Sequence, residues 1–432
     1  MVLGRAFLIV ASIVAASGCN QSLFDSHGGS GSDGPGPIAE TCQAPCVGDA
    51  AAEYDGTSAG STGHWRYLDD HRDRTWAAMT AGSDGTMAGV DTANTIGTCA
   101  ARGNAGPCAD LPGALLLSSS GSTSDADPAI ELTVPTTEVV QITVHARVGD
   151  GQAPQQIRLY RNSREDVLAT QVASPGTTLD LQIKLDALAG DRFLVAVAPA
   201  TVGADQIALH MFVSGTGETF PLQCQMAVTF ASATGNAVEN QCGGSVTSYD
   251  ATGTAAPPTL AAGPFVEEGM AANVAVGNYY SASATLDKSG DTTTQLWVDP
   301  GVVGADAQFM ISDHDLDVGG GLALALFIDS NDNMLKLDVS TCSSPSPLTF
   351  DGGQTPFPAD QKWHFLRAVH TGGNVLICLD GTRVFSFPVA AGKLASTYPP
   401  YLAKNVIWTP AGAFYGGGID DVRVFSTALP CD

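Results

Sequence analysis

The chain has 432 residues, and its 44 Asp and Glu residues outnumber its 19 Lys and Arg residues, which gives a net charge of −25. A nucleic acid would be repelled by this charge, so nucleic acid is disfavoured as a partner. Hydrophobic residues make up 44% of the chain and charged residues only 15%, a composition that excludes wholesale disorder, collagen and coiled coil. The length predicts two or three domains.

The first 18 residues have the features of an export signal. Arg5 precedes an apolar run from Ala6 to Ala16, which is too short to span a bilayer. Small residues follow and end at Cys19, and this ending resembles the bacterial lipoprotein signal. The resemblance implies that Cys19 becomes the first mature residue and holds the protein on the lipid bilayer through its acyl chains. Ordinary secretion with cleavage nearby is the alternative.

The residue after this cysteine bears on localisation. The lipoprotein resemblance implies that an Asp at this position retains a protein at the inner membrane, and the chain has Asn20 instead. We therefore expect an exported lipoprotein at the outer membrane and on the cell surface. Residues 19–63 are rich in Gly, Ser and Asp and lack apolar periodicity, which predicts a disordered, flexible stalk.

Residues 64–219 are expected to form one all-β domain. From residue 114 onward, short β-type segments recur at the spacing of strands in a sandwich. Apolar and polar residues alternate clearly from Leu179 to Leu185, so one face of that strand would meet a core and the other would meet water. No convincing helical stretch interrupts the pattern. The aromatic residues Trp65, Tyr67 and Trp76 are compatible with a carbohydrate-binding or adhesion module.

A second series of β-type segments fills residues 223–432. It includes TTTQLWVD (292–299), WHFLRAVH (363–370), NVLICLDG (374–381) and GIDDVRVFSTAL (418–429). The order of these motifs resembles the laminin-G-like (LamG), concanavalin A-like jelly roll. The resemblance implies two packed antiparallel sheets with the first and last strands adjacent, which would bring Cys224 near Cys431. Asp380 and Gly381 are typical of a hairpin turn between strands.

The predicted fold class is therefore all-β, with two β-sandwich domains that follow a signal peptide and a disordered linker. The first sandwich covers residues 64–219. The second, the jelly roll, covers residues 223–432.

Nine cysteines follow the lipidation site, and outside the cytoplasm they are most simply structural disulfides. Sequence neighbours suggest the pairs Cys42 with Cys46 and Cys99 with Cys108. Cys342 could meet Cys378 across adjacent strands, and either Cys224 or Cys242 could bond to Cys431. Spacing does not fix the connectivity, and nine is an odd number, so one cysteine is free or intermolecular. The nine are Cys42, Cys46, Cys99, Cys108, Cys224, Cys242, Cys342, Cys378 and Cys431.

Concanavalin A-like folds also include glycoside hydrolases, which need two convergent carboxylates. The related glucanases supply them in a Glu-x-Asp-x-x-Glu motif, and this motif is absent. Beyond residue 242 the glutamates are Glu267 and Glu268, neighbours whose side chains point to opposite faces of a strand. Adjacency separates Asp420 from Asp421 in the same way, and the resemblance implies that they close turns and pair with Arg423 or with backbone amides. We predict no catalytic residue and no enzymatic activity.

Two groups of acidic residues predict a calcium site, because hard oxygen donors at alternating positions suit Ca²⁺. Neither group fits the EF-hand pattern. Solvated turns are the alternative, since Asp and Asn favour turn geometry. The groups are Asp313, Asp315 and Asp317, and then Asp329 and Asp332 with their neighbouring asparagines.

Sugar binding requires an exposed aromatic ring for stacking and polar groups for hydroxyls. Tyr398, Tyr401 and Tyr415 lie in loop-rich sequence that can supply such rings. We predict a non-catalytic cell-surface lipoprotein whose LamG-like domain serves in adhesion and binds glycans or an extracellular protein. A structural envelope spacer and a diverged glycoside hydrolase are the alternatives. Exposed aromatics gathered on one face of the jelly roll would favour sugar binding, and two convergent carboxylates would favour a hydrolase.

Overall fold

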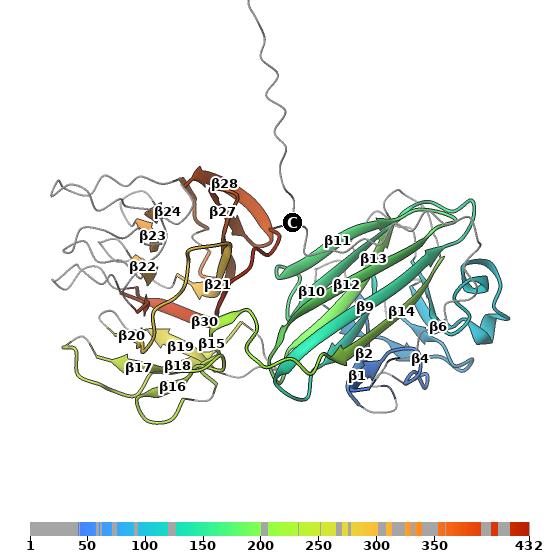
Figure 1. Ribbon diagram of the computed structural model, residues 1–432, viewed down its shortest axis with the longest axis horizontal. Coiled ribbons are helices and arrows are strands. Elements are labelled where there is room, and N and C mark those ends of the chain that lie inside the picture. Colours follow the sequence, from blue (N-terminus) through green and yellow to red (C-terminus); the bar gives the residue numbers. More distant parts are fainter. Residues whose placement is uncertain are drawn as a thin grey trace, which may run out of the picture.

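The computed structural model consists of two β-sandwiches that lie side by side (Figure 1). This confirms the predicted all-β class. In the part of the chain that the structure describes, the helices are two short 3₁₀ turns, η1 (Ala100–Arg102) and η2 (Gly106–Ala109). The described residues are 42, 44–57, 60, 63–70, 76–89, 94–119, 127–199, 206–231, 233–250, 252–264, 270–274, 278–300, 308–312, 325–329, 333–338, 353–358, 360–389, 399–404 and 415–431.

None of the helices within these described residues has the length and apolar character that crossing a bilayer requires.

Two antiparallel sheets form the first sandwich. Sheet A contains, in spatial order, β12 (Thr178–Ala187), β9 (Glu138–Val148), β14 (Gln206–Gly215), β7 (Leu115–Ser118), β6 (Thr95–Thr98), β5 (Met87–Ala88) and β4 (Thr80–Ala81), and β1 (Cys46–Asp49) pairs with β14. Sheet B contains β11 (Val167–Ala173), β10 (Gln155–Arg161), β13 (Arg192–Pro199), β8 (Pro128–Thr133), β2 (Trp65–Asp70) and β3 (Trp76–Ala78).

The alternating segment predicted from the sequence is strand β12. Its residues Leu181, Ile183 and Leu185 are buried in the core between the two sheets, while the residues between them face outward. Opposite Leu181 in the ladder lies Val144 of β9, which is also buried. Each of these apolar side chains contributes roughly 1.5–3 kcal/mol when it leaves water. The period-two pattern therefore fixes which face of sheet A meets the core.

The flexible stalk does not extend to residue 63, so this predicted boundary is wrong. Strand β1 pairs with β14 at Cys46 opposite Ser214, and Ala50 belongs to the buried core. The hydroxyl of Tyr54 donates a hydrogen bond to the carbonyl of Ile96 at 2.9 Å. The Gly and Ser enrichment of this segment suggested a stalk. The contacts that order it are made with strands far along the chain, which local composition does not reveal.

Trp65 and Tyr67 are also core residues of the first sandwich, with no exposed surface. They do not offer aromatic rings to a ligand, so their compatibility with a binding module was misleading. Period two places both on the inner face of β2, where they pack between the sheets.

The second sandwich also has two antiparallel sheets. Sheet C contains β18 (Leu260–Ala262), β19 (Met270–Val274), β30 (Gly417–Phe425), β21 (Thr292–Asp299), β26 (His364–Thr371), β27 (Asn374–Leu379) and β28 (Thr382–Pro388), and β15 (Cys224–Val228) pairs with β30. Sheet D contains β16 (Ala237–Glu239), β17 (Ser245–Tyr249), β20 (Tyr279–Ala282), β29 (Tyr401–Leu402), β22 (Gln308–Ser312), β23 (Ala325–Asp329), β24 (Met334–Asp338) and β25 (Gln354–Pro356).

Two features expected of the jelly roll are present. The first strand of the domain, β15, pairs with the last, β30, with Cys224 opposite Phe425. Asp380 and Gly381 connect β27 to β28 and have φ angles of 50° and 74°. Positive φ at both central positions is the geometry of a type I′ hairpin turn, which explains the Asp-Gly sequence.

Four disulfides are formed among the described residues. Cys42–Cys46 and Cys99–Cys108 confirm the two pairs suggested by sequence neighbours. The other two are Cys224–Cys242 and Cys378–Cys431, so the predicted bonds of Cys342 to Cys378 and of Cys224 or Cys242 to Cys431 are wrong. Cys224 and Cys431 lie on separate sides of β30, in different apolar clusters. Cys19 and Cys342 lie outside the described residues.

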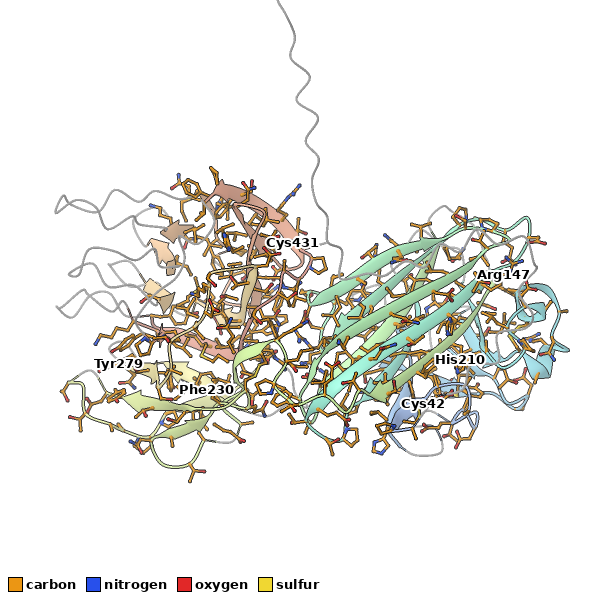
Figure 2. All side chains as sticks on the ribbon, in the orientation of Figure 1. Cys42, Arg147, His210, Phe230, Tyr279 and Cys431 are labelled. Carbon is orange, nitrogen blue, oxygen red and sulfur yellow. A yellow bond between two sulfur atoms is a disulfide. The ribbon has the colours of Figure 1, made fainter. Side chains whose placement is uncertain are left out.

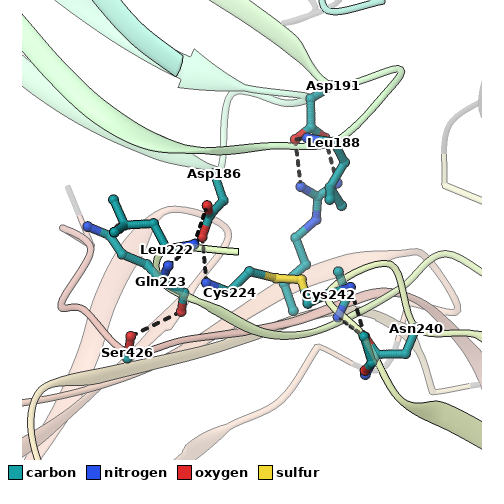
Figure 3. The surroundings of a disulfide bond; sticks show 12 residues. Asp186, Leu188, Asp191, Leu222, Gln223, Cys224, Asn240, Cys242 and Ser426 are labelled. Carbon is teal, nitrogen blue, oxygen red and sulfur yellow. Dashed lines mark hydrogen bonds and ion pairs between the residues drawn. A yellow bond between two sulfur atoms is a disulfide. The ribbon is translucent and has the colours of Figure 1, made fainter. Parts of the chain in front are cut away.

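The connection between the sandwiches is held by one carboxylate. Asp186, at the end of β12, accepts hydrogen bonds from the backbone N–H groups of Leu222, Gln223 and Cys224 at 2.8, 2.5 and 2.6 Å. Figure 3 shows this carboxylate beside the Cys224–Cys242 disulfide, where it meets the start of the second domain. Three N–H donors on one carboxylate restrict the motion of this connecting segment, because each hydrogen bond is charge-assisted.

Buried ion pairs join the outer face of sheet C to the first sandwich. The guanidinium of Arg423 donates to both oxygens of Asp191 at 2.8 and 3.0 Å and to Asp421 at 2.6 Å. Arg367 donates to Asp166, which also accepts from Arg161 at 2.8 Å. All six side chains are at most 3% exposed. Three arginines and three aspartates balance in charge here, as buried ions must if the desolvation cost is to be offset.

Candidate functional site

The outer face of sheet D is the candidate site, because the first sandwich does not cover it. Sheet C uses its own outer face to contact the first domain through Gln295, Arg367 and Arg423. The inner faces of sheets C and D enclose the core. Figure 2 shows Tyr279, on sheet D, at the side of the second sandwich that points away from the first.

Three tyrosines gather on this face from three neighbouring strands. Tyr249 ends β17 and lies directly opposite Tyr279, which begins β20. Their rings are stacked, with centroids 5.0 Å apart and an interplanar angle of 11°. Tyr401 begins β29 opposite Ser281, and its ring centroid lies 6.0 Å from that of Tyr279. We call Tyr249, Tyr279, Tyr401 and the nearby Lys404 the tyrosine platform.

Strand alternation explains why the tyrosines point outward. Tyr280, the next residue along β20, is 1% exposed and packs edge to face against Phe230 in the core. Its neighbour Tyr279 must then lie on the opposite face of the strand. Tyr249 and Tyr401 are half-buried, so parts of their rings are open to solvent, whereas Tyr279 between them is 8% exposed.

Lys404 covers the central ring. Its Nζ lies 3.9 Å from the ring centroid of Tyr279 and 5.8 Å from that of Tyr401, which is cation–π geometry. Partial burial lowers the pKa of Lys404 below its ordinary value. Burial also raises the pKa of the Tyr279 hydroxyl, and the neighbouring Tyr401 and Tyr249 raise it further. The platform thus presents three phenol groups and the amine of Lys404.

A small polar loop borders the platform. The Asp250 side chain accepts hydrogen bonds from the backbone of Thr252 and Thr254 at 2.8 and 2.9 Å and from the Thr252 hydroxyl at 2.7 Å. Gly253 has a φ of 82° at the tip, and a Cβ there would lie 3.6 Å from the Tyr279 hydroxyl oxygen. The loop therefore places hydroxyl and carboxylate groups beside the aromatic rings.

This arrangement can hold a flat, amphiphilic ligand. Aromatic rings bury the apolar face of such a molecule, and phenol, ammonium and threonine groups are available for its polar edge. The arrangement has the parts that binding requires.

The sequence predicted one member of this site and misplaced another. Tyr401 lies on the tyrosine platform, and its role in ligand binding stays a prediction. Tyr415 is fully buried, and its hydroxyl donates to the carbonyl of Asp299 at 2.5 Å, so its prediction as a ligand-binding residue is wrong. It packs in the core of the jelly roll, where its ring meets apolar side chains. Tyr398 lies outside the described residues.

Sequence reasoning missed Tyr249, Tyr279 and Lys404. Tyr249 and Tyr279 stand at strand ends, but only the pairing of β17 with β20 brings them together. The Tyr279–Tyr280 pair carried a usable signal, because two successive aromatic residues on a strand must place one ring on each face.

Four of the five predicted calcium ligands lie beyond the part of the chain that the structure describes. Asp313, Asp315, Asp317 and Asp332 lie outside the described residues, and Asp329 is the last residue of β23. In the described part of the chain, no group of three or more His, Cys, Asp or Glu side chains could hold a metal ion. Calcium binding stays a prediction.

Of the two carboxylates predicted to be structural, Asp421 forms an ion pair and Asp420 accepts a backbone hydrogen bond. Asp421 accepts from Arg423, and the side chain of Asp420 accepts from the backbone N–H of Asp421 at 2.8 Å. Both aspartates are buried, at 4% and 2% exposure. Glu267 and Glu268 lie outside the described residues.

One histidine lies between two further carboxylates. His364 Nδ1 lies 2.8 Å from Asp380 and Nε2 lies 2.9 Å from Asp360. These bonds, that to Asp380 first, raise the pKa of His364 against the opposing effect of burial. Each ring nitrogen of His364 therefore already has a carboxylate partner, and the three side chains have a structural role in the fold.

Comparison with known proteins agrees with this fold. Residues 274–431 match the laminin G-type family model of the concanavalin A-like lectin/glucanases superfamily. This match confirms the resemblance predicted for the second sandwich. A search of curated protein sequences found no match.

Several solved structures are similar to this chain. One is domain 4 of AbnA, a GH43 extracellular arabinanase from Geobacillus stearothermophilus, in complex with arabinotriose, at 19% identity and a TM-score of 0.38, covering 48% of this chain and 95% of that chain. Another is the botulinum neurotoxin serotype C1 binding domain, at 13% identity and a TM-score of 0.31, covering 48% and 50%. The match thus spans about half the length of the binding-domain chain in this second structure.

Proposed function

We propose that the protein is an exported lipoprotein, held at the outer membrane by Cys19, whose second sandwich binds glycans without cleaving them. The tyrosine platform carries this proposal, because it gathers partly exposed aromatic rings and polar groups on one face of a lectin-type domain. A spacer protein would need no such cluster. The family match supports a binding role for the same domain.

The position of the platform supports a ligand outside the cell. The first sandwich covers sheet C, so the free face of sheet D points away from it (Figure 2). A tethered N-terminal segment would reach the described domains through the first sandwich, at β1. The second sandwich then follows the first along the chain from the anchor, and its platform is available to extracellular glycans.

The first prediction concerns lipidation at Cys19. Replacing Cys19 with alanine should abolish incorporation of labelled palmitate and should move the protein from the membrane to the soluble fraction. Multiple acyl chains bind a bilayer far more firmly than one, at about 0.8 kcal/mol per buried methylene, so the change in fractionation should be complete. A Cys342→Ala variant is the control and should keep its label. Labelling that persists in Cys19→Ala contradicts the anchor.

The second prediction concerns glycan binding by the tyrosine platform. The full chain should retain glycans on an array, and Tyr401→Ala should weaken retention about tenfold or more, because the open ring of the platform is lost. Tyr401→Phe is the matched control, since it keeps the ring and loses the hydroxyl. It should bind within about twofold of the unaltered protein. Circular dichroism checks that each variant is folded.

The array uses the full chain for a physical reason. The second sandwich alone would leave Arg367 and Arg423 without Asp166 and Asp191, and these guanidinium groups are buried. Running the array with calcium and with a chelator tests the predicted calcium site at the same time. Retention of no glycan under either condition, or equal retention by Tyr401→Ala, contradicts the proposed function.

A further inference from the structure

His364 lies at one end of the second sandwich and contacts segments of both sheets. It is the first residue of β26 in sheet C and is 7% exposed. Phe357, which follows β25 of sheet D, packs edge to face against the imidazole, with ring centroids 5.4 Å apart. Asp380 lies in the turn between β27 and β28, and Asp360 lies in the connection between β25 and β26. One imidazole therefore joins three separate segments of the jelly roll.

Both ring nitrogens of His364 are within hydrogen-bond distance of a carboxylate. Nδ1 lies 2.8 Å from Asp380 and Nε2 lies 2.9 Å from Asp360. An ionised carboxylate only accepts, and a neutral imidazole has one N–H donor and one acceptor nitrogen, so a neutral ring would leave one carboxylate facing a lone pair. An imidazolium donates from both nitrogens. The geometry therefore matches the protonated ring, and the raised pKa of His364, caused first by the bond to Asp380, agrees with it.

Further charged groups surround this cluster. Glu165 of the first sandwich lies against the turn that carries Asp380, and burial raises the pKa of its carboxyl. The guanidinium of Arg164 lies over an aromatic ring of the first sandwich, 4.5 Å from the ring centroid. Lys362 Nζ is 4.0 Å from Asp360, but its side chain is 76% exposed, so water and salt screen its charge. Among the described residues, the imidazolium is the buried cation in contact with Asp360 and Asp380.

The two carboxylates differ in how the rest of the fold holds them. The other oxygen of Asp380 accepts the backbone N–H of Phe365 at 2.9 Å, and Asp380 itself occupies a hairpin-turn position with a φ of 50°. Asp360 accepts the backbone N–H of Lys362 at 3.2 Å, which lies in the same connection. Asp380 is thus anchored to β26 without the imidazole. Loss of the ring proton should therefore break the contact with Asp360 and keep the contact with Asp380.

We propose that His364, Asp360 and Asp380 form a proton-sensitive clasp at this end of the jelly roll. With the imidazole protonated, the clasp holds the connection between β25 and β26 against sheet C. Removal of the proton leaves Nδ1 as the donor to Asp380, releases Asp360 and opens the connection to solvent. A histidine with a raised folded-state pKa stabilises the closed form fully below its ordinary pKa of 6.5, and this contribution is lost as the pH rises through the raised value. The bond from His364 lowers the pKa of Asp360, so the clasp stays closed in mild acid.

Trypsin cleavage after Lys362 tests the clasp, because this lysine lies in the connection and is exposed. The full chain and the Asp360→Ala variant are digested side by side at pH 6.5 and pH 9.5, and mass spectrometry gives the rate of cleavage between Lys362 and Trp363. The ratio of the two rates cancels the pH dependence of trypsin itself. The variant should be cleaved about fivefold faster at pH 6.5, where more than half of the ring is protonated, and at about the same rate as the unaltered chain at pH 9.5.

Asp287→Ala is the matched control. Asp287 is an exposed aspartate of the same sandwich that also accepts a backbone N–H two residues along the chain, from Ser289 at 2.9 Å. Its loss should leave cleavage after Lys362 unchanged at both pH values. A second measurement is the titration of His364 by nitrogen NMR of histidine-labelled protein, with His364→Gln identifying the signal. The midpoint should lie above 6.5 and should fall by about 0.5 or more in Asp360→Ala.

The two measurements together decide the proposal. A cleavage ratio that falls with pH, combined with a midpoint above 6.5, supports the clasp. A ratio near one at pH 6.5, a ratio equally large at pH 9.5, or a midpoint at or below 6.5 overturns it. The clasp includes no residue of the tyrosine platform, so Tyr401→Ala should leave the cleavage ratio unchanged while it weakens glycan retention on the array.

Discussion

Replacing Arg367 with methionine should lower the free energy of unfolding by about 3–5 kcal/mol, the range found when one partner of a buried ion pair is removed. The Arg367 side chain has no exposed surface, and its guanidinium donates to Asp166, to Gln295 at 3.1 Å and to the carbonyl of Val167 at 3.0 Å. Methionine fills similar space but removes the Arg367 donor from each of these buried acceptors, and Asp166 keeps Arg161 as its cationic partner.

Urea unfolding followed by tryptophan fluorescence measures the effect of Arg367→Met. Arg383→Met is the matched control, because this arginine is exposed on β28 and its loss should change stability by less than about 0.5 kcal/mol. A loss below about 1 kcal/mol for Arg367→Met would mean that the buried contacts do not hold the sandwiches together. Its partner across the domains is 201 residues away in the sequence, so the effect reports on the junction.

Strand β12 of the first sandwich could be predicted from the sequence because one of its faces is exposed to water. The strict alternation of Leu181, Ile183 and Leu185 with polar residues predicted β12, and all three side chains are buried in the structure. The start of the first sandwich could not be read, since β1 is four residues long and gains its stability from pairing with β14. Local composition in that region favoured a stalk, and tertiary contacts overrode it.

The second sandwich was predicted through its motifs, but the geometry of its site was not. Tyr401 could be named as an aromatic residue in a loop-rich region, yet its partner Tyr279 lies 122 positions earlier. A single sequence does not reveal which strands are neighbours in space. The same limit explains the disulfides, because Cys378 and Cys431 meet only through the packing of β27 against the C-terminal segment.

Acid should destabilise the junction between the sandwiches. Burial alone would raise the pKa values of Asp166 and Asp191. The charges of Arg161 and Arg367 nevertheless hold the pKa of Asp166 below its ordinary value of 3.8. The charge of Arg423 does the same for the pKa of Asp191. A carboxyl with a lowered folded-state pKa stabilises the fold fully above its ordinary pKa. That stabilisation is lost as the pH falls through the folded-state pKa.

One group in the network works in the opposite direction. Burial raises the pKa of Asp421 despite its bond to Arg423, so protonation of Asp421 in mild acid relieves part of the desolvation cost. Below pH 4, the stability lost through Asp166 and Asp191 together is larger than the stability gained through Asp421. Each of the two contributes a slope of at most about 1.4 kcal/mol per pH unit.

The free energy of unfolding, measured by urea titration at pH 2.5 to 6, should therefore fall steeply below pH 4. Asp166→Asn should be less stable than the unaltered protein at pH 6 and should lose stability less steeply below pH 4, because an amide binds no proton in this range. Asp150→Asn, whose side chain is 85% exposed, is the control and should follow the unaltered curve. If Asp166→Asn keeps the full acid slope, the buried carboxylates of the junction do not cause it, and the ion pairs at the sheet C face would then contribute little to the coupling of the two domains.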